Sequence, residues 1–147
     1  MAQRDDKHIR QVKAMMRELQ HDADKLRLND NDGAAVGAVL IQNGHHYYGF
    51  NSIGRNGMHE CHTHAEIMAI RVANKDVMND IECSSMITTR APCEYCAAHI
   101  IASGITEVYC PPIRIGSKWR ESQEIGRRIM EYVGIKVVEV ELEGVRG

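Results

Sequence analysis

The sequence predicts a single α/β domain with a mixed sheet, and three observations lead to this prediction. The length of 147 residues is that of one domain with one hydrophobic core. Hydrophobic residues make up 44% of the chain and charged residues 26%, a composition typical of globular proteins and not of disordered or fibrous ones. From residue 64 onward, helical and strand patterns alternate, which indicates crossover connections between parallel strands.

A long amphipathic helix is predicted at the start of the chain, from residue 5 to residue 28. The turn formers at 29–33 end it. Its apolar residues recur at alternating spacings of three and four, which places them on one helical face that is expected to lie against the sheet. These residues are Ile9, Val12, Met16, Leu19, Ala23 and Leu26.

A β-hairpin and a polar loop are predicted next. The apolar run at 35–41 is typical of a buried strand, Asn43 and Gly44 form the hairpin turn, and the returning strand covers 47–51. The segment 52–62 is polar and contains several histidines, so we expect a loop there.

The remaining predicted elements are alternating helices and strands. Gly104 and Gly134 follow two of the helical patterns and are typical helix stops. Because a helix separates the last two strands, these strands are expected to run parallel. The pattern predicts helices at 64–74, 92–103 and 118–132 and strands at 85–89, 107–110 and 135–142.

Charge and hydropathy exclude several classes of protein. Eighteen basic and 20 acidic residues give a formal charge of −2, so no nucleic-acid partner is expected. The longest apolar run, 34–41, is far shorter than the roughly 20 residues that a membrane-spanning helix needs. The first residues are charged and show no signal peptide, so we expect a cytoplasmic protein without a membrane partner.

The five cysteines indicate metal ligation or buried thiols rather than disulfides. Their number is odd, and the chain shows no export signal, which favours a reducing compartment. Cys83 and Cys110 are expected to be buried thiols.

Two short segments predict a metal site. A His-x-Glu segment at 64–66 opens one predicted helix, and a Pro-Cys-x-x-Cys segment at 92–96 opens the next. Cys93 and Cys96 are three residues apart, so both sulfurs face the same side of the first helical turn, where the helix N-terminus favours thiolates. Together with His64, they supply three ligands for one zinc ion.

Three protein ligands are typical of a catalytic zinc site, because structural sites usually have four and catalytic sites keep a position for water. Zinc lowers the pKa of bound water to roughly 7. Glu66 is expected to lie beside that water as a proton carrier.

Simpler interpretations exist for each motif alone. Glu66 could close a capping box that starts at Thr63, and an isolated Cys-x-x-Cys is more often redox-active or structural than catalytic. The two motifs together, in this order, form the signature of zinc nucleobase deaminases, which favours the catalytic interpretation.

At these residues, and from about residue 36 to 142, the chain resembles the cytidine and deoxycytidylate deaminase superfamily. Within it, the chain is most similar to the small deoxycytidylate (dCMP) deaminases of bacteria and viruses. The segment 51–55 is similar to the family's Asn-Gly-x-Pro-Arg, although Ser52 and Gly54 replace the glycine and the proline. The other matching residues are Thr89, Pro92, Cys93, Cys96, Ala97, Ile100, Gly104, Ile105, Val108 and Tyr109.

The resemblance implies a cytidine-deaminase-like three-layer α/β/α sandwich with a five-stranded mixed sheet, and Zn²⁺ as the cofactor. It implies hydrolytic deamination of dCMP to dUMP with release of ammonia, a step that supplies thymidylate synthesis. Asn51 would then bond the deoxyribose, and Arg55 would pair with the 5′-phosphate. Members of the family are oligomers, commonly hexamers, and many are activated by dCTP and inhibited by dTTP.

Further substrate contacts are expected after the fourth strand. The segment 111–128 carries five basic and two acidic residues and follows a strand end, where ligands of open α/β sheets bind. Arg114 and Lys118 are therefore candidate phosphate partners, whereas Arg127 and Arg128 are expected to form a solvated helix face.

Contacts to the base are expected from backbone and aromatic groups. The backbone amides at Ala65 and Cys93 are candidate donors to the base carbonyl and the reacting oxygen, because helix starts leave such donors unpaired. Tyr109 and Trp119 either flank the base or belong to the core.

A second cluster, His59, Cys61 and His62, precedes the first ligand. It could hold a structural zinc ion, but the loop is short and offers no fourth ligand. We therefore expect substrate-loop residues here, with His62 helping to position a sugar or phosphate. His99 is expected to pack or to form a hydrogen bond rather than to bind the metal.

Two alternatives stay open. One is a deaminase of another substrate: a substituted dCMP, cytidine, a free base or tRNA adenosine. The tRNA substrate is disfavoured by the overall acidity and by Tyr95, where that branch usually has methionine. The other is a noncatalytic zinc-stabilised binding module, which would have no need of Glu66.

Overall fold

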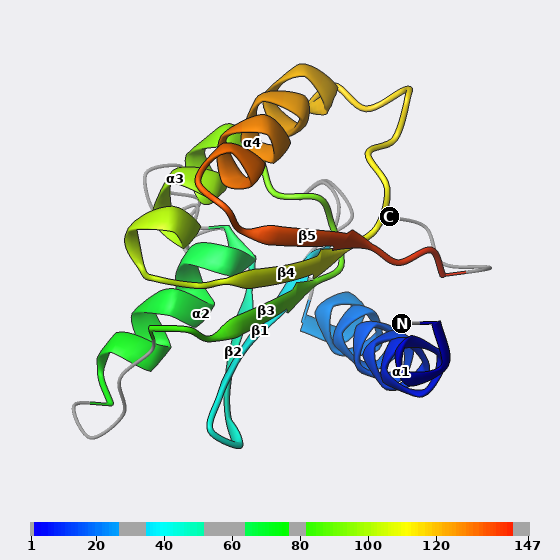
Figure 1. Ribbon diagram of the computed structural model, residues 1–147, viewed down its shortest axis with the longest axis vertical. Helices are drawn as coiled ribbons and strands as arrows, with labels where there is room; N and C mark the ends of the chain where they lie inside the picture. Colours follow the sequence, from blue (N-terminus) through cyan, green and yellow to red (C-terminus); the bar gives the residue numbers. More distant parts are fainter. Residues whose placement is uncertain (1, 27–34, 52–63, 77–81, 143–147) are drawn as a thin grey trace.

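The structure is a computed structural model that describes residues 2–26, 35–51, 64–76 and 82–142. It contains a five-stranded sheet with the strand order β2-β1-β3-β4-β5, flanked by four helices (Figure 1). The elements are α1 (Ala2–Leu26), β1 (Gly37–Gln42), β2 (His45–Phe50), α2 (Ala65–Asn74), β3 (Ser85–Thr88), α3 (Glu94–Ala102), β4 (Glu107–Cys110), α4 (Arg120–Tyr132) and β5 (Lys136–Glu139).

The sheet is mixed. Strand β1 pairs antiparallel with β2 and β3, whereas β3, β4 and β5 run parallel with α3 and α4 as their crossovers. The hairpin turns at Asn43 and Gly44, whose φ angles of 52° and 81° are the positive values that a type I′ turn requires. The predicted fold class is thus confirmed, and the largest differences in bounds lie at the ends of the chain. Helix α1 begins at Ala2 rather than at 5, and β5 ends at Glu139 rather than at 142.

Of the helices that the structure describes, α1 alone covers one face of the sheet (Figure 1). Its predicted apolar face contacts the sheet through buried Val12, Met16 and Leu19, but Leu26, at the end of the helix, is 57% exposed. None of the helices in the described part of the chain could traverse a bilayer, because the 25-residue α1 is charged along its length and the next longest has 13 residues.

Helices α2, α3 and α4 cover the opposite face and complete the three layers (Figure 1). Alternate residues of the central strands, Leu40, Met86 and Val108, point to this face and are buried. They pack against the inner sides of the three helices, which contribute Ala65, Ala69, Ile70, Ala73, Ala97, Ile100 and Met130.

Strand β2 approaches α2 closely at Gly49. A Cβ atom at this position would lie 2.3 Å from the Ala65 carbonyl oxygen and 2.4 Å from the Ala69 nitrogen, so backbone atoms would have to move. We expect Gly49→Ala to destabilise the fold by about 1–3 kcal/mol and to lower the Tm by several degrees. Thermal unfolding measures this, with Gly116→Ala as the control because a Cβ there meets nothing within 4 Å. An unchanged Tm for Gly49→Ala would contradict the close approach.

The two cysteines outside the predicted metal site differ in burial. Cys110 is buried, as predicted, but Cys83 is exposed, so that prediction was wrong. The reason is local: Cys83 lies in the turn before β3 with a φ angle of 64°, and its N–H donates to the Gly104 carbonyl.

Candidate metal centre

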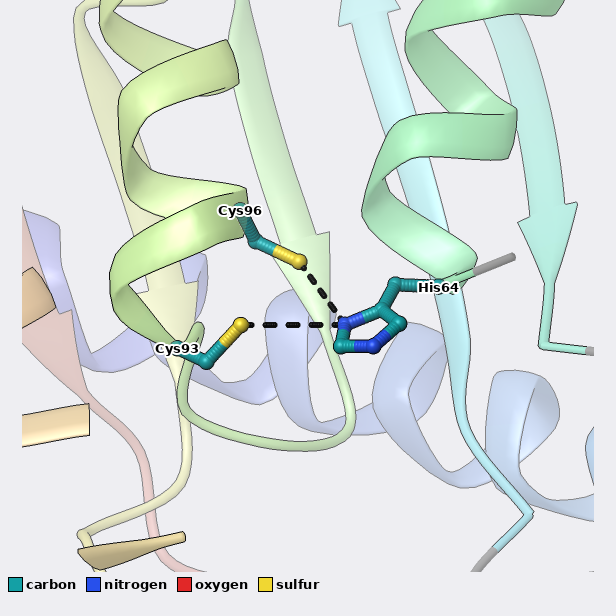
Figure 2. A group of neighbouring side chains, drawn as sticks. All are labelled: His64, Cys93 and Cys96. Atoms are coloured by element: carbon teal, nitrogen blue, oxygen red, sulfur yellow. Dashed lines mark hydrogen bonds between the residues drawn. The ribbon is translucent and has the colours of Figure 1, made fainter. Parts of the chain in front are cut away.

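The predicted metal ligands come from the starts of two neighbouring helices. His64 is the N-cap residue of α2 and Cys93 is the N-cap residue of α3, and both have extended backbone angles. Neither side chain forms a capping hydrogen bond. Cys96 lies one turn into α3, and Figure 2 shows both sulfurs pointing toward the imidazole of His64. The two motifs, although 29 residues apart from His64 to Cys93, therefore meet at one place.

The spacing of the three donor atoms fits a zinc ion. The Nδ1 atom of His64 lies 3.2 Å from Cys96 Sγ and 3.7 Å from Cys93 Sγ, and all three atoms lie within 4.8 Å of one another. Tetrahedral zinc with bonds of about 2.05 Å to nitrogen and about 2.3 Å to sulfur requires a nitrogen–sulfur separation of about 3.6 Å. Within the described ranges, no other three His, Cys, Asp or Glu side chains are grouped in this way.

The two thiols differ in acidity. A hydrogen bond from Cys96 lowers the pKa of Cys93 to about 4, against the effect of burial, and His64 also lowers it. The same hydrogen bond, together with burial, raises the pKa of Cys96. The hydrogen bond between His64 and Cys93 raises the pKa of His64. The two sulfurs and the imidazole nitrogen are donor types that zinc binds.

Glu66 is the one buried acidic side chain among the residues that the structure describes, at 4% exposure. It lies in the first turn of α2, and burial raises its pKa, while its own backbone N–H and His64 lower it. Because His64 is the N-cap of α2, Glu66 occupies the second position of the helix, whereas a capping box requires an acidic residue at the third position. A carboxyl group of raised pKa beside metal ligands is suited to proton transfer.

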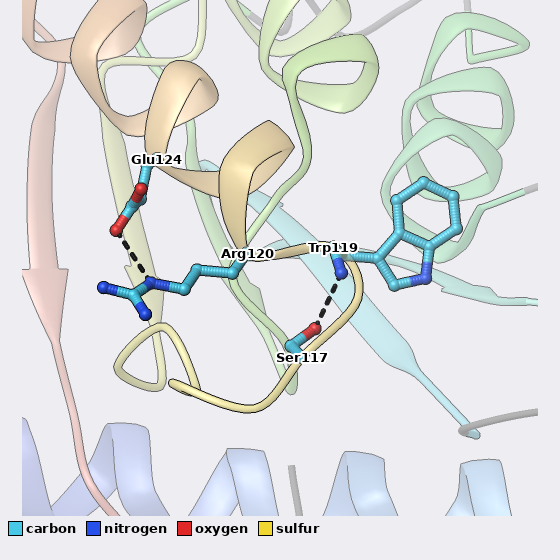
Figure 3. A network of polar contacts seen from close by, with 4 residues as sticks. All are labelled: Ser117, Trp119, Arg120 and Glu124. Carbon is cyan, nitrogen blue, oxygen red and sulfur yellow. Dashed lines mark hydrogen bonds and ion pairs between the residues drawn. The ribbon is translucent and has the colours of Figure 1, made fainter.

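Aromatic rings surround His64. Trp119 packs against Cys93 and Cys96 and meets the His64 ring edge-on at 5.9 Å between centroids, and Tyr95 does the same at 6.3 Å. His99 contacts Tyr95 at 4.9 Å, in line with a packing role. Ser117 Oγ accepts the backbone N–H of Trp119, and the indole points away from the neighbouring Arg120–Glu124 ion pair (Figure 3).

A pocket of about 280 Å³ lies at the carboxyl ends of β3 and β4 and contains both predicted cations, Arg114 and Lys118. It also contains Arg90, which the sequence analysis missed. The missed signal is its place between the end of β3 and Cys93, where ligands of open α/β sheets bind. The pocket is lined by Thr89, Arg90, Ala91, Pro111, Pro112, Arg114, Gly116, Ser117, Lys118 and Gln123.

Asn51 is tied to the segment that precedes Arg90. Its Oδ1 accepts the N–H of Val36 at 2.8 Å, and its own N–H donates to the Val36 carbonyl at 3.1 Å. The next residue, Gly37, forms two hydrogen bonds of 3.0 Å with Thr89. The Gly37 N–H donates to the Thr89 hydroxyl oxygen, and the Thr89 N–H donates to the Gly37 carbonyl. The end of β2 and the end of β3 are thus held together through the start of β1.

Tyr109 is not brought to the metal centre. Its ring packs on the face covered by α1, where its hydroxyl lies 2.9 Å from His8 Nε2. This placement corrects the expected contact with the base, since neighbouring strand residues face opposite sides of the sheet. Of the other predicted residues, Ala65 is buried at the start of α2. His59, Cys61, His62 and Arg55 lie outside the described residues.

Residues 9–111 match the family described as the cytidine and deoxycytidylate deaminase zinc-binding region. The match covers more than half of the chain, so the chain belongs to this family. Zinc is the metal of this family region, and the His64, Cys93 and Cys96 donor set fits it.

Particular relatives show a range of substrates. An uncharacterised deaminase in the luxG 3′ region of Aliivibrio fischeri is 34% identical over 82 residues, which are 54% of this chain and 53% of that protein. A diaminohydroxyphosphoribosylaminopyrimidine deaminase/reductase from Thermotoga maritima is 29% identical with a TM-score of 0.71, over 92% of this chain and 38% of that one. The dCMP deaminase of cyanophage S-TIM5 is 21% identical with a TM-score of 0.66, over 88% and 97%, which shows the shared fold. The chain thus spans about half the length of the curated relative that it matches.

Proposed function

We propose that the protein catalyses the hydrolytic deamination of dCMP to dUMP and ammonia, which supplies dUMP for thymidylate synthesis. The observation that supports this most is the buried Glu66 carboxyl beside a three-donor metal group, with a cation-lined pocket next to it. A noncatalytic zinc module would have no use for a carboxyl group of raised pKa at this position.

In this proposal, His64, Cys93 and Cys96 hold the zinc ion. When bound, zinc would act as a Lewis acid and lower the pKa of the attacking water to roughly 7. Glu66 takes the proton from the attacking water and delivers it to N3 of the cytosine ring, which makes C4 electrophilic. The water oxygen bonds to C4, and Glu66 then carries the second proton from this oxygen to the amino group, so that the C4–N bond breaks, ammonia leaves and N3 keeps its proton.

Backbone and side-chain donors orient the ring and sugar. The N–H groups at the starts of α2 and α3, at Ala65 and Cys93, are the proposed donors to the ring carbonyl and the reacting oxygen. Asn51 is the proposed deoxyribose contact, and its amide is fixed in orientation by Val36. Trp119, beside His64, is the proposed wall of the base site.

The phosphate needs cations, since Arg binds a phosphate bidentately. Arg114 and Lys118 lie in the pocket and are proposed contacts. Arg55 and His62 stay proposed contacts on the basis of the family resemblance. The hexamer, the cytoplasmic location and the regulation by dCTP and dTTP that the resemblance implies also stay predictions.

A second candidate substrate is a ribosyl-phosphate aminopyrimidine. The observation that favours it is the 29% identity over 92% of this chain to the Thermotoga maritima enzyme, which is named for such a compound. Both candidates are aminopyrimidines that carry a sugar phosphate.

A substrate panel distinguishes these proposals. It consists of cytosine, cytidine, deoxycytidine, dCMP, dCTP, 5-substituted dCMP, the diaminohydroxyphosphoribosylaminopyrimidine and a tRNA adenosine substrate, assayed for ammonia with the zinc-loaded protein. We expect kcat/KM for dCMP to exceed that for deoxycytidine about tenfold to a hundredfold, because the phosphate contributes charge-assisted hydrogen bonds. Equal rates on both would contradict a nucleotide substrate, and turnover of the ribosyl-phosphate compound alone would favour the second candidate.

A further inference from the structure

The pocket at the carboxyl ends of β3 and β4 has an unusual charge for this chain. Three of its ten lining residues, Arg90, Arg114 and Lys118, are cationic, and none is acidic. The whole chain has a formal charge of −2, so this concentration of positive charge is local. A volume of about 280 Å³ is near the lower limit of ligand pockets, which suits one part of a nucleotide rather than all of it.

Arg90 is three residues before the metal ligand Cys93 in the sequence, and it interacts electrostatically with Cys93 and Glu66. It is partly buried, and burial lowers its pKa, as does the charge of Arg114, whereas Glu66 and Cys93 raise it. Two guanidinium groups that repel each other in a partly desolvated pocket are stabilised when an anion binds between them. Arg90 therefore lies within electrostatic reach both of Arg114 in the pocket and of Glu66 beside the metal ligands.

The segment from Ala91 to Cys93 joins the pocket to the metal centre, and helix α4 packs against it. Gln123 of α4 donates from Nε2 to the Ala91 carbonyl at 2.9 Å, and a Cβ on Gly126 would lie 3.0 Å from backbone atoms of Cys93. Helix α4 thus fixes the segment from Ala91 to Cys93, which joins Arg90 to the metal ligand. A substrate held at both ends would be positioned by one rigid segment.

We propose that Arg90, with Arg114 and Lys118 beside it, forms the subsite for the substrate phosphate, and that Arg90 sets the preference for phosphorylated substrates. The proposal deepens the proposed function and depends on it for the identity of the ligand. It assigns the leading role to Arg90, which follows β3.

The test is the binding of dUMP and deoxyuridine to zinc-loaded protein, measured by calorimetry. We expect Arg90→Gln to weaken dUMP binding about tenfold to a hundredfold and to leave deoxyuridine binding unchanged, with Arg90→Lys in between. The matched control is Arg128→Gln, which removes the same charge from an exposed position on α4 and is expected to have no effect. Circular dichroism and zinc content check the fold, and Arg114→Gln, with a smaller expected loss, carries the test if Arg90→Gln does not fold.

The outcomes separate the subsite from the proposed function. Unchanged dUMP affinity in a folded Arg90→Gln variant, or equal losses for dUMP and deoxyuridine, overturns the subsite and leaves the proposed function in place. If the wild-type protein binds inorganic phosphate through Arg90 but does not bind dUMP, the subsite stands and the dCMP proposal is wrong. Binding of neither dUMP nor phosphate overturns the subsite.

Discussion

Glu66→Gln is expected to reduce kcat for deamination by about 10²–10⁴ while zinc stays bound. The amide has the shape of the carboxyl group and can fill the same buried position, but it cannot accept a proton from water and pass it to the ring. Burial at 4% exposure leaves bulk water a poor substitute for this proton carrier. The measurement is ammonia release, with zinc content determined on the same samples.

The control for this variant is Glu94→Gln, which makes the same chemical change on an exposed side chain in the first turn of the neighbouring helix α3. It is expected to keep the wild-type rate. Near wild-type ammonia release from Glu66→Gln would remove Glu66 from the mechanism and restore the interpretation as a structural carboxyl group.

Replacing Cys96 by Ser is expected to lower the affinity for zinc more than about a hundredfold, and activity should fall with zinc occupancy. The loss of a direct ligand should exceed the cost of about 10- to 100-fold that follows from disturbing a ligand's hydrogen-bond partner. Cys96 is fully buried on α3 and its sulfur lies 3.2 Å from His64 Nδ1, so the hydroxyl group is too short and too weakly acidic to replace it.

Zinc affinity is measured by competition with a chelator, and zinc-dependent stabilisation by thermal unfolding. Added zinc should raise the Tm of the wild-type protein and of Cys83→Ser, whose thiol is exposed and outside the group. It should leave the Tm of Cys96→Ser almost unchanged. Equal stabilisation of both variants would mean that zinc binds elsewhere.

The metal group could be predicted from the sequence because its ligands occur at fixed positions relative to helix starts. One helical turn of α3 brings Cys93 and Cys96 together. His64 reaches them because it is the N-cap of α2, which lies on the same face of the sheet. The strand β4 was predicted with its observed bounds, since its short apolar run ends at Pro111.

The rest of the site depends on tertiary contacts that no local pattern reveals. Tyr109 has neighbours in sequence that face α2, α3 and α4, whereas its own side chain faces α1; because residues on both faces of β4 are buried, the sequence does not indicate which face each residue takes. Arg90 becomes part of a pocket because β4 lies beside β3 and brings the segment from Pro111 to Lys118 next to it. Cys83 looked like a core thiol but lies in a turn.

The paired hydrogen bonds from Asn51 through Val36 and Gly37 to Thr89 have a consequence for specificity. These bonds join two segments that are far apart in sequence before any ligand binds, so a ligand that contacts both would lose little conformational entropy in ordering them. A change of preferred substrate during evolution would then proceed by exchange of individual side chains on the same backbone.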